Sequence, residues 1–181
     1  MFSIYMNEKL QITITLLYVG ACIIIYSIIR CTNQEIKDPL QKILGGKNTR
    51  FAQMLDGWSI SHFIFYGALA NIYPNEIPFI IFCGILWEIF EYLTSNSNLK
   101  ILGILRGISE CKIVTGESQT WFYAKYTDIL MNVLGCLIGY LIYKYTNLQI
   151  KNVFLSLLYP TLLFIGINVY YNYKNIINTT H

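Results

Sequence analysis

Two glutamates stand near the end of an apolar stretch, in the run C-G-I-L-W-E-I-F-E-Y at positions 83–92. Glu88 and Glu91 are three positions apart, so a helix places both carboxylates on one face. Gly84 lies one turn earlier on the same face. Charged side chains are costly within a membrane helix and usually mark a functional site. We therefore expect this face to carry chemistry.

Two further groups of polar residues begin other apolar segments. Asp56 and His62 open one segment in the run D-G-W-S-I-S-H, where His62 shares a helical face with Ser59 and Tyr66. A second segment carries a stripe of polar and small residues at helical spacing, namely Asp128, Asn132, Gly135 and Gly139. Glycines allow another helix to approach closely, so this stripe is predicted to face protein rather than lipid.

Packed together, these faces would collect one imidazole, up to four carboxylates and an amide, a set that suits a hard divalent cation. Ca²⁺ takes roughly 6–8 oxygen ligands and Mg²⁺ about six. Ca²⁺ is the first expectation, with Mg²⁺ or Mn²⁺ as alternatives, while a single histidine without a nearby cysteine argues against Zn²⁺. The predicted metal ligands are Glu88, Glu91, Asp128 and Asn132.

The predicted catalytic residues are His62 and Asp56. His62 can act as a general base near neutral pH, and Asp56 would orient it or complete the metal shell. Each polar residue also has an ordinary structural interpretation. Either glutamate could pair with Arg106 or Lys125, Asp128 could favour a helix start, and His62 could be a structural histidine. Their convergence, described below, favours a site.

The elements that must position these residues are predicted to be membrane helices. Only 13% of the 181 residues are charged and 55% are hydrophobic, whereas soluble domains contain about 25% charged residues. The sequence contains no basic stripe interleaved with aromatic residues, so we do not expect nucleic-acid binding. We predict an all-α, polytopic membrane bundle in a single domain, with helices at about 12–29, 59–73, 77–93, 127–145 and 153–170.

Five spans would place the two chain ends on opposite sides of the membrane. Of the 13 Lys and Arg residues, Lys9, Lys144 and Lys151 fall on the side of the N-terminus, and the others fall on the opposite side. The positive-inside rule therefore predicts an N-terminus outside and the second side in the cytoplasm. On this topology the polar ends of the second, third and fourth helices all meet at the cytoplasmic leaflet.

The ordered blocks at 56–62, 87–91 and 128–135 resemble the VanZ-like group of small integral membrane proteins, which chain length and helix number also fit. The same blocks are similar to the core of base-exchange phosphatidylserine synthases. Those enzymes share an Asp six residues before a His, a W-E-x-x-E block, and a later acid, Trp, Asp and Asn. They are much longer chains. This resemblance implies calcium-dependent exchange of a phospholipid headgroup.

These observations lead to two principal functional hypotheses, with membrane lipid as the partner in the first. One is a metal-binding pocket at the cytoplasmic leaflet that acts on phospholipid headgroups by exchange or hydrolysis. The alternative is a non-enzymatic VanZ-like protein that binds lipid or a partner, with its polar cluster serving helix packing. A transporter or channel is less favoured, because no polar stripe crosses the membrane. Whether the chain is an enzyme, and its oligomeric state, are left open.

Overall fold

The computed structural model describes residues 7–32, 55–96, 110–112, 118–120, 125–146 and 148. Their elements are α1 (Glu8–Thr32), α4 (Gly57–Ile72), α5 (Ile77–Asn96), β1 (Glu110–Lys112), β2 (Ser118–Thr120) and α7 (Tyr126–Thr146). The fold is thus mainly helical, as predicted, with a short antiparallel strand pair that the sequence did not suggest. The chain divides into two compact units, which are described separately below.

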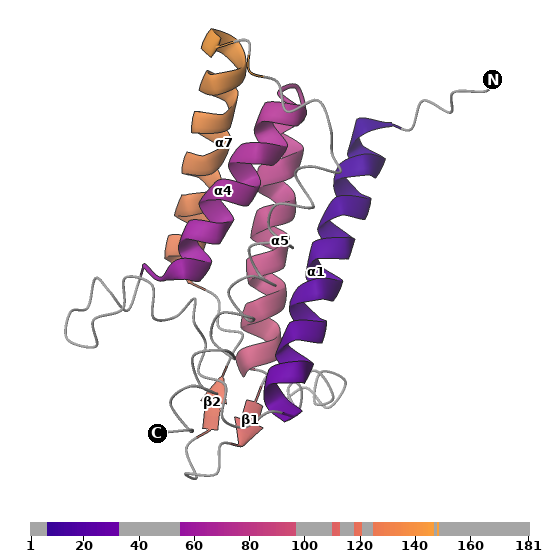
Figure 1. Cartoon of the computed structure of the whole chain (residues 1–181), viewed down its shortest axis with the longest axis vertical. Coiled ribbons are helices and arrows are strands. Elements are labelled where there is room, and N and C mark those ends of the chain that lie inside the picture. The colour runs from indigo at the N-terminus through magenta and orange to yellow at the C-terminus, as the bar shows by residue number, and fades with distance from the viewer. Residues whose placement is uncertain are drawn as a thin grey trace, which may run out of the picture. The chain divides into compact units, whose positions relative to one another are not determined.

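The first unit contains α1, α5, the two strands and the first residues of α7. Helices α1 and α5 lie side by side, and a methyl group added at Gly20 would come within 2.9 Å of the Trp87 ring (Figure 1). Near their N-terminal ends, the Lys9 ammonium lies 3.8 Å from a Glu76 carboxylate oxygen and also covers the Phe79 ring. These contacts at matching ends mean that α1 and α5 run in the same direction.

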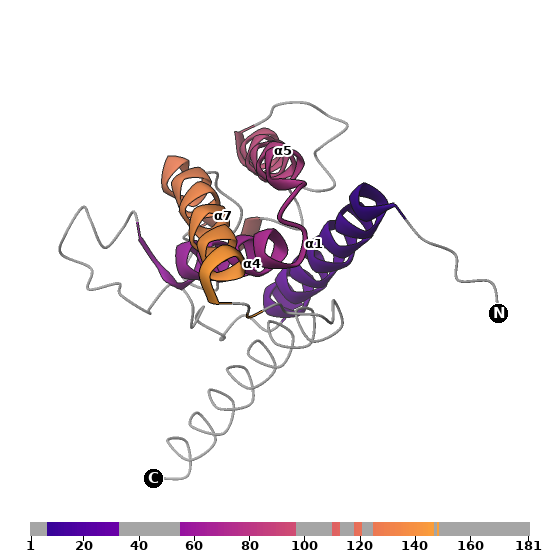
Figure 2. The ribbon, with the colours of Figure 1, turned by 90° about the horizontal axis from the view of Figure 1, so that it is seen from above.

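The second unit contains α4 and most of α7, which cross closely at three glycines (Figures 1 and 2). Gly67 meets the backbone of Gly135, where a methyl group would stand 3.1 Å from the carbonyl oxygen. Added methyl groups at Gly135 and Gly139 would collide with the carbonyl oxygens of Phe63 and Gly67, respectively. The contacts advance along both helices together, so α4 and α7 also run in the same direction.

Asn71 links α4 to the α7 segment near the C-terminal end of α4. Its buried side-chain amide donates to the carbonyl oxygens of Gly139 at 3.3 Å and Leu148 at 3.0 Å. The opposite end of α4 begins at Asp56, whose carboxylate accepts from the Ser59 backbone N–H at 3.1 Å. This is the usual geometry of a helix N-cap. Asp56 therefore has a structural role in addition to the catalytic one predicted for it.

Helices α1, α4, α5 and α7 lie at the positions of the first four predicted spans. The fifth predicted helix, 153–170, lies outside the described residues. Two helical segments in the described part, Glu8–Ile25 and Tyr126–Thr146, are long and apolar enough to cross a membrane. In α7 many large apolar side chains are exposed, among them Leu130, Leu134, Leu137 and Leu141. Such a surface suits contact with lipid and is consistent with membrane association.

Candidate functional site

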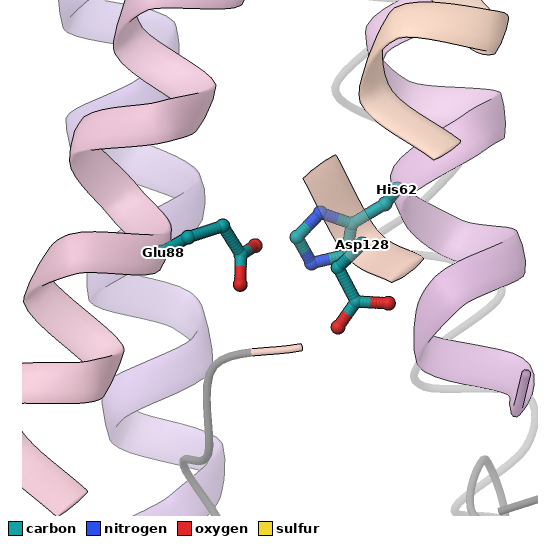
Figure 3. A group of neighbouring side chains, drawn as sticks. All are labelled: His62, Glu88 and Asp128. Atoms are coloured by element: carbon teal, nitrogen blue, oxygen red, sulfur yellow. The ribbon is translucent and has the colours of Figure 1, made fainter. Parts of the chain in front are cut away.

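Three carboxylates of the first unit are buried close to one another. Glu88 and Glu91 lie on α5 with exposed fractions of 2% and 9%, and Asp128 lies in the first turn of α7 with 3%. One carboxylate oxygen of Glu88 is within 4.8 Å of one of Asp128. Figure 3 shows these two side chains extending from their helices. The structure thus brings together two of the four predicted metal ligands, Glu88 and Asp128, and Glu91 follows Glu88 one turn later on α5.

Each glutamate has a defined neighbour that orients it. The Lys125 backbone N–H, just before α7, donates to Glu88 Oε2 at 3.4 Å. The Trp87 indole N–H donates to Glu91 Oε1 at 2.7 Å, one turn away on α5. This donor–acceptor distance is at the short end of the range for N–H···O hydrogen bonds in proteins. The second contact gives Trp87 a role that we did not predict, although its spacing of four residues from Glu91 could have indicated it.

Asp128 lies in the first turn of α7 and is also close to Glu88. Its backbone N–H donates to the Lys125 carbonyl oxygen at 3.0 Å, in the first turn of α7. A negative charge at this end of a helix is favoured by the positive end of the helix dipole. The same position directs the carboxylate toward Glu88. The structural interpretation of Asp128 and its place in an acidic cluster are therefore compatible.

The fourth predicted ligand, Asn132, lies in the second unit with His62. Asn132 is on α7 and has an exposed fraction of 1%. Its Oδ1 atom is 2.9 Å from Nδ1 of His62, which extends from α4 and also stacks on the Tyr66 ring 6.0 Å away. We expected Asn132 beside a metal, and the contact with His62 was not predicted. Sequence spacing alone does not indicate a pair separated by so many residues.

The close packing of α4 and α7 explains why His62 and Asn132 can meet. A short amide and an imidazole can bridge two helices only where their backbones come near each other. Gly135, one turn after Asn132, provides that approach by meeting Phe63 and Gly67 of α4. The glycine stripe predicted from the sequence is therefore a packing surface, and it supports the polar contact one turn away.

The site residues thus fall into two sets that share one helix. Three buried acids of the first unit, Glu88, Glu91 and Asp128, are called the acidic cluster, in which Glu88 and Asp128 have carboxylate oxygens within 4.8 Å of each other. A histidine–amide pair comprises His62 and Asn132. Helix α7 runs from the first unit into the second and carries one member of each set, Asp128 and Asn132, one turn apart. The acidic cluster has the oxygen chemistry of a cation site, and the pair has the chemistry of a proton acceptor held by a neighbouring amide.

The comparisons with known proteins place no further constraint on function. No protein-family model, curated protein or solved structure shows significant similarity to this chain.

Proposed function

We propose that this chain is a polytopic membrane protein with a divalent-cation pocket that acts on phospholipid headgroups at the cytoplasmic leaflet. The observation that carries the proposal is the acidic cluster, Glu88, Glu91 and Asp128, with all three side chains at most 9% exposed. Buried acids are rare unless they are paired or bind a metal. The resemblance to phosphatidylserine synthases supplies the substrate class, and the same three acids belong to the blocks that carry it.

The donor set of the acidic cluster fits a hard cation. Carboxylate oxygens are the preferred ligands of Ca²⁺, Mg²⁺ and Mn²⁺, and the cluster contains no sulfur donor. The Glu88 and Asp128 oxygens within 4.8 Å of each other repel when both are charged, and a cation would offset that repulsion. We propose Ca²⁺ as the first candidate. Glu88, Glu91 and Asp128 would hold the cation, which would supply charge neutralisation at the phosphoryl oxygens.

Helix α7 carries one residue of each set. Asp128 and Asn132 are one helical turn apart and leave α7 on the same face. Asn132 in turn contacts His62. The proposal takes His62 as the general base. Asp56, which caps α4, would act on His62 by fixing the start of the helix that carries it.

The reaction proposed for His62 is proton abstraction from an attacking hydroxyl group. In hydrolysis the attacker is water, and in headgroup exchange it is the alcohol of the incoming headgroup. The attacking oxygen bonds to phosphorus while its proton passes to His62. The phosphorus–oxygen bond to the departing headgroup breaks, and that oxygen leaves as an alcohol after accepting a proton. A base that takes one proton and returns one is the ordinary role of histidine in such reactions.

The directions of the helices support the proposed five-span topology. In that topology the first and third spans run in one direction, and the second and fourth run in the other. The parallel pairs α1 with α5 and α4 with α7 are consistent with this alternation. With the N-terminus outside, the acidic end of α5 and the beginning of α7 reach the cytoplasmic leaflet, where charged headgroups are present.

Cation binding by the purified protein tests the proposal. The melting temperature in detergent is measured against Ca²⁺, Mg²⁺ and Mn²⁺ for the parent, for Glu88→Gln/Glu91→Gln, and for the control Glu8→Gln. Glu8 is an exposed acid in the first turn of α1. We expect a saturable rise in the parent and the control, because a ligand that binds the folded state stabilises it. The double variant should show none, and a flat response in the parent would contradict the proposal.

The second candidate function is a non-enzymatic membrane protein that binds lipid or a partner. Its supporting observation is that several polar residues already serve helix packing, as Asp56 does at the N-cap and Asn71 at the far end of α4. This candidate predicts that Glu88→Gln/Glu91→Gln changes only the folded yield. Headgroup-exchange and hydrolysis assays in lipid nanodiscs separate the two. Turnover by the parent that the folded double variant lacks would favour the enzyme.

A further inference from the structure

The contacts of the Asn132 side chain indicate a role that differs from the metal ligand predicted for it. It is 1% exposed and lies between α7 and α4, with its Oδ1 atom 2.9 Å from His62 Nδ1. An amide oxygen can only accept a hydrogen bond, so this contact requires a proton on Nδ1. In neutral His62 the ring lone pair then belongs to Nε2. The contact with Asn132 thus selects the nitrogen that can accept a proton from an attacking hydroxyl group.

The other end of the same amide is a buried donor. Among the residues that the structure describes, Asn132 Nδ2 has no hydrogen-bond partner. Buried polar groups almost always have a partner, and a buried donor without one destabilises the fold. A bound molecule with an acceptor oxygen would satisfy this donor.

Rotating the amide by half a turn would exchange its two ends. Nδ2 would then donate to His62 Nδ1, and Oδ1 would occupy the position that lacks a partner. That arrangement suits a cation at Oδ1, as the sequence prediction assumed. The two arrangements make opposite demands on a ligand, because a donor requires an acceptor oxygen whereas Oδ1 favours a positive charge. They also place the His62 proton on different nitrogens, so they can be distinguished experimentally.

We propose that Asn132 positions His62 through Oδ1 and binds a phosphoryl oxygen of the lipid headgroup through Nδ2. This inference rests on the proposed function and specifies which residue recognises the substrate. On α7, Asn132 follows Asp128 by one turn, so these two side chains leave neighbouring turns of one helical face. Carboxylates suit the cation and the amide N–H suits the phosphoryl oxygen. Asn132 is therefore assigned to the anion, not to the cation.

Nitrogen NMR of histidine tests the positioning role. The chain contains two histidines, so protein labelled with ¹⁵N-histidine gives signals from His62 and His181 only, and His62→Gln assigns them. We expect the Nδ1–H tautomer of His62 in the parent. Asn132→Asp, which keeps an acceptor oxygen, should retain it, whereas Asn132→Leu should change the His62 tautomer and leave the His181 signals unaltered. An unchanged His62 tautomer in Asn132→Leu would overturn the positioning role.

Binding of defined lipids tests the phosphoryl contact. The parent in detergent is titrated with dioctanoyl phosphatidic acid, with dioctanoylglycerol as the matched lipid without phosphate, and with inorganic phosphate. We expect saturable binding of the phosphatidic acid and none of dioctanoylglycerol. Binding of inorganic phosphate with equal affinity would identify free phosphate, and not a lipid, as the ligand and overturn the lipid assignment. Asn132→Asp and Asn132→Leu should each weaken the phosphatidic acid about tenfold to a hundredfold, the range for loss of a hydrogen bond to a charged group.

The two variants also separate this inference from the proposed function. Both the inference and the proposed function are supported if cations stabilise the parent and Asn132→Leu alike, while Asn132→Leu loses the phosphatidic acid binding of the parent. Cation binding that is stronger in Asn132→Asp, with lipid binding unchanged, would make Asn132 a metal ligand and overturn the inference while the proposed function stands. If Asn132→Asp does not fold, Asn132→Leu carries the lipid test, because an apolar side chain of similar size removes the donor without adding charge.

Discussion

Trp87 connects α1 to the acidic cluster. Its ring lies against Gly20 of α1, and its indole N–H donates to Glu91. α1 itself carries no residue of the candidate site, so its influence on the cluster would pass through this contact. Mutation of a group that orients a metal ligand typically costs about 10–100-fold in metal affinity or activity. Trp87 is therefore a positioning residue in the proposed cation site.

Replacing Trp87 by Phe should separate its hydrogen bond from its packing. Phe keeps an aromatic ring against Gly20 but has no N–H to donate to Glu91. We expect the Ca²⁺ concentration at half-saturation to rise about tenfold or more, since Glu91 loses the group that orients it. Cation titration of the melting temperature measures this effect. Trp58→Phe, on α4, is the control, and an equal change in both variants would mean that the Trp87 bond has no specific role.

Glycines decide how closely α4 and α7 approach. A methyl group at Gly135 would collide with the Phe63 carbonyl oxygen, and one at Gly139 would collide with the Gly67 carbonyl oxygen. These atoms belong to the backbone and cannot rotate away, so the helices would have to separate. His62 and Asn132 depend on that approach, because their contact spans the same two helices. The packing of the pair and the geometry of its polar contact are therefore coupled.

Gly135→Ala should lower stability and disturb the histidine–amide pair together. Overpacking of this kind costs about 1–3 kcal/mol, which should appear as a lower melting temperature. The His62 tautomer measured by NMR should also change in the fraction that folds. The control is Leu134→Ala, at the neighbouring position of α7, which removes an exposed side chain. A Gly135→Ala protein with unaltered stability and tautomer would contradict the close packing of α4 and α7.

Helix positions could be predicted because the apolar runs end at clear polar or turn residues. Asp56 caps α4, and the short link at Pro74 separates α4 from α5. The proximity of Glu88 and Asp128 also agrees with the prediction that the end of one helix and the start of the next lie on the same side. The hydrogen-bond partners of individual side chains could not be predicted. The pairing of His62 with Asn132 depends on the rotation of two helices that are distant in sequence. β1 has three residues, which is too few for an alternating pattern to indicate a strand.

At the scale of the whole chain, the direction of each helix determines which side of the membrane its ends reach. The ion pair of Lys9 with Glu76 joins the beginnings of α1 and α5, so both helices start on one side if both cross the bilayer. The acidic cluster lies toward the other end of α5 and at the start of α7. A topology with the N-terminus outside therefore places the cluster near the cytoplasmic headgroups, where the proposed substrate is reached without crossing the membrane.

Cysteine labelling in intact cells would test this orientation. In a variant whose five native cysteines are replaced by alanine, single cysteines are introduced by Asn75→Cys, in the α4–α5 link, or by Gly46→Cys, between the first two predicted spans. We expect a membrane-impermeant maleimide to label the cysteine at position 75 in intact cells and the one at position 46 only after lysis. The positive-inside rule predicts this pattern from the Lys and Arg distribution. The reversed pattern would place the acidic cluster at the outer leaflet, and labelling of both positions in intact cells would mean that the second predicted span does not cross the membrane.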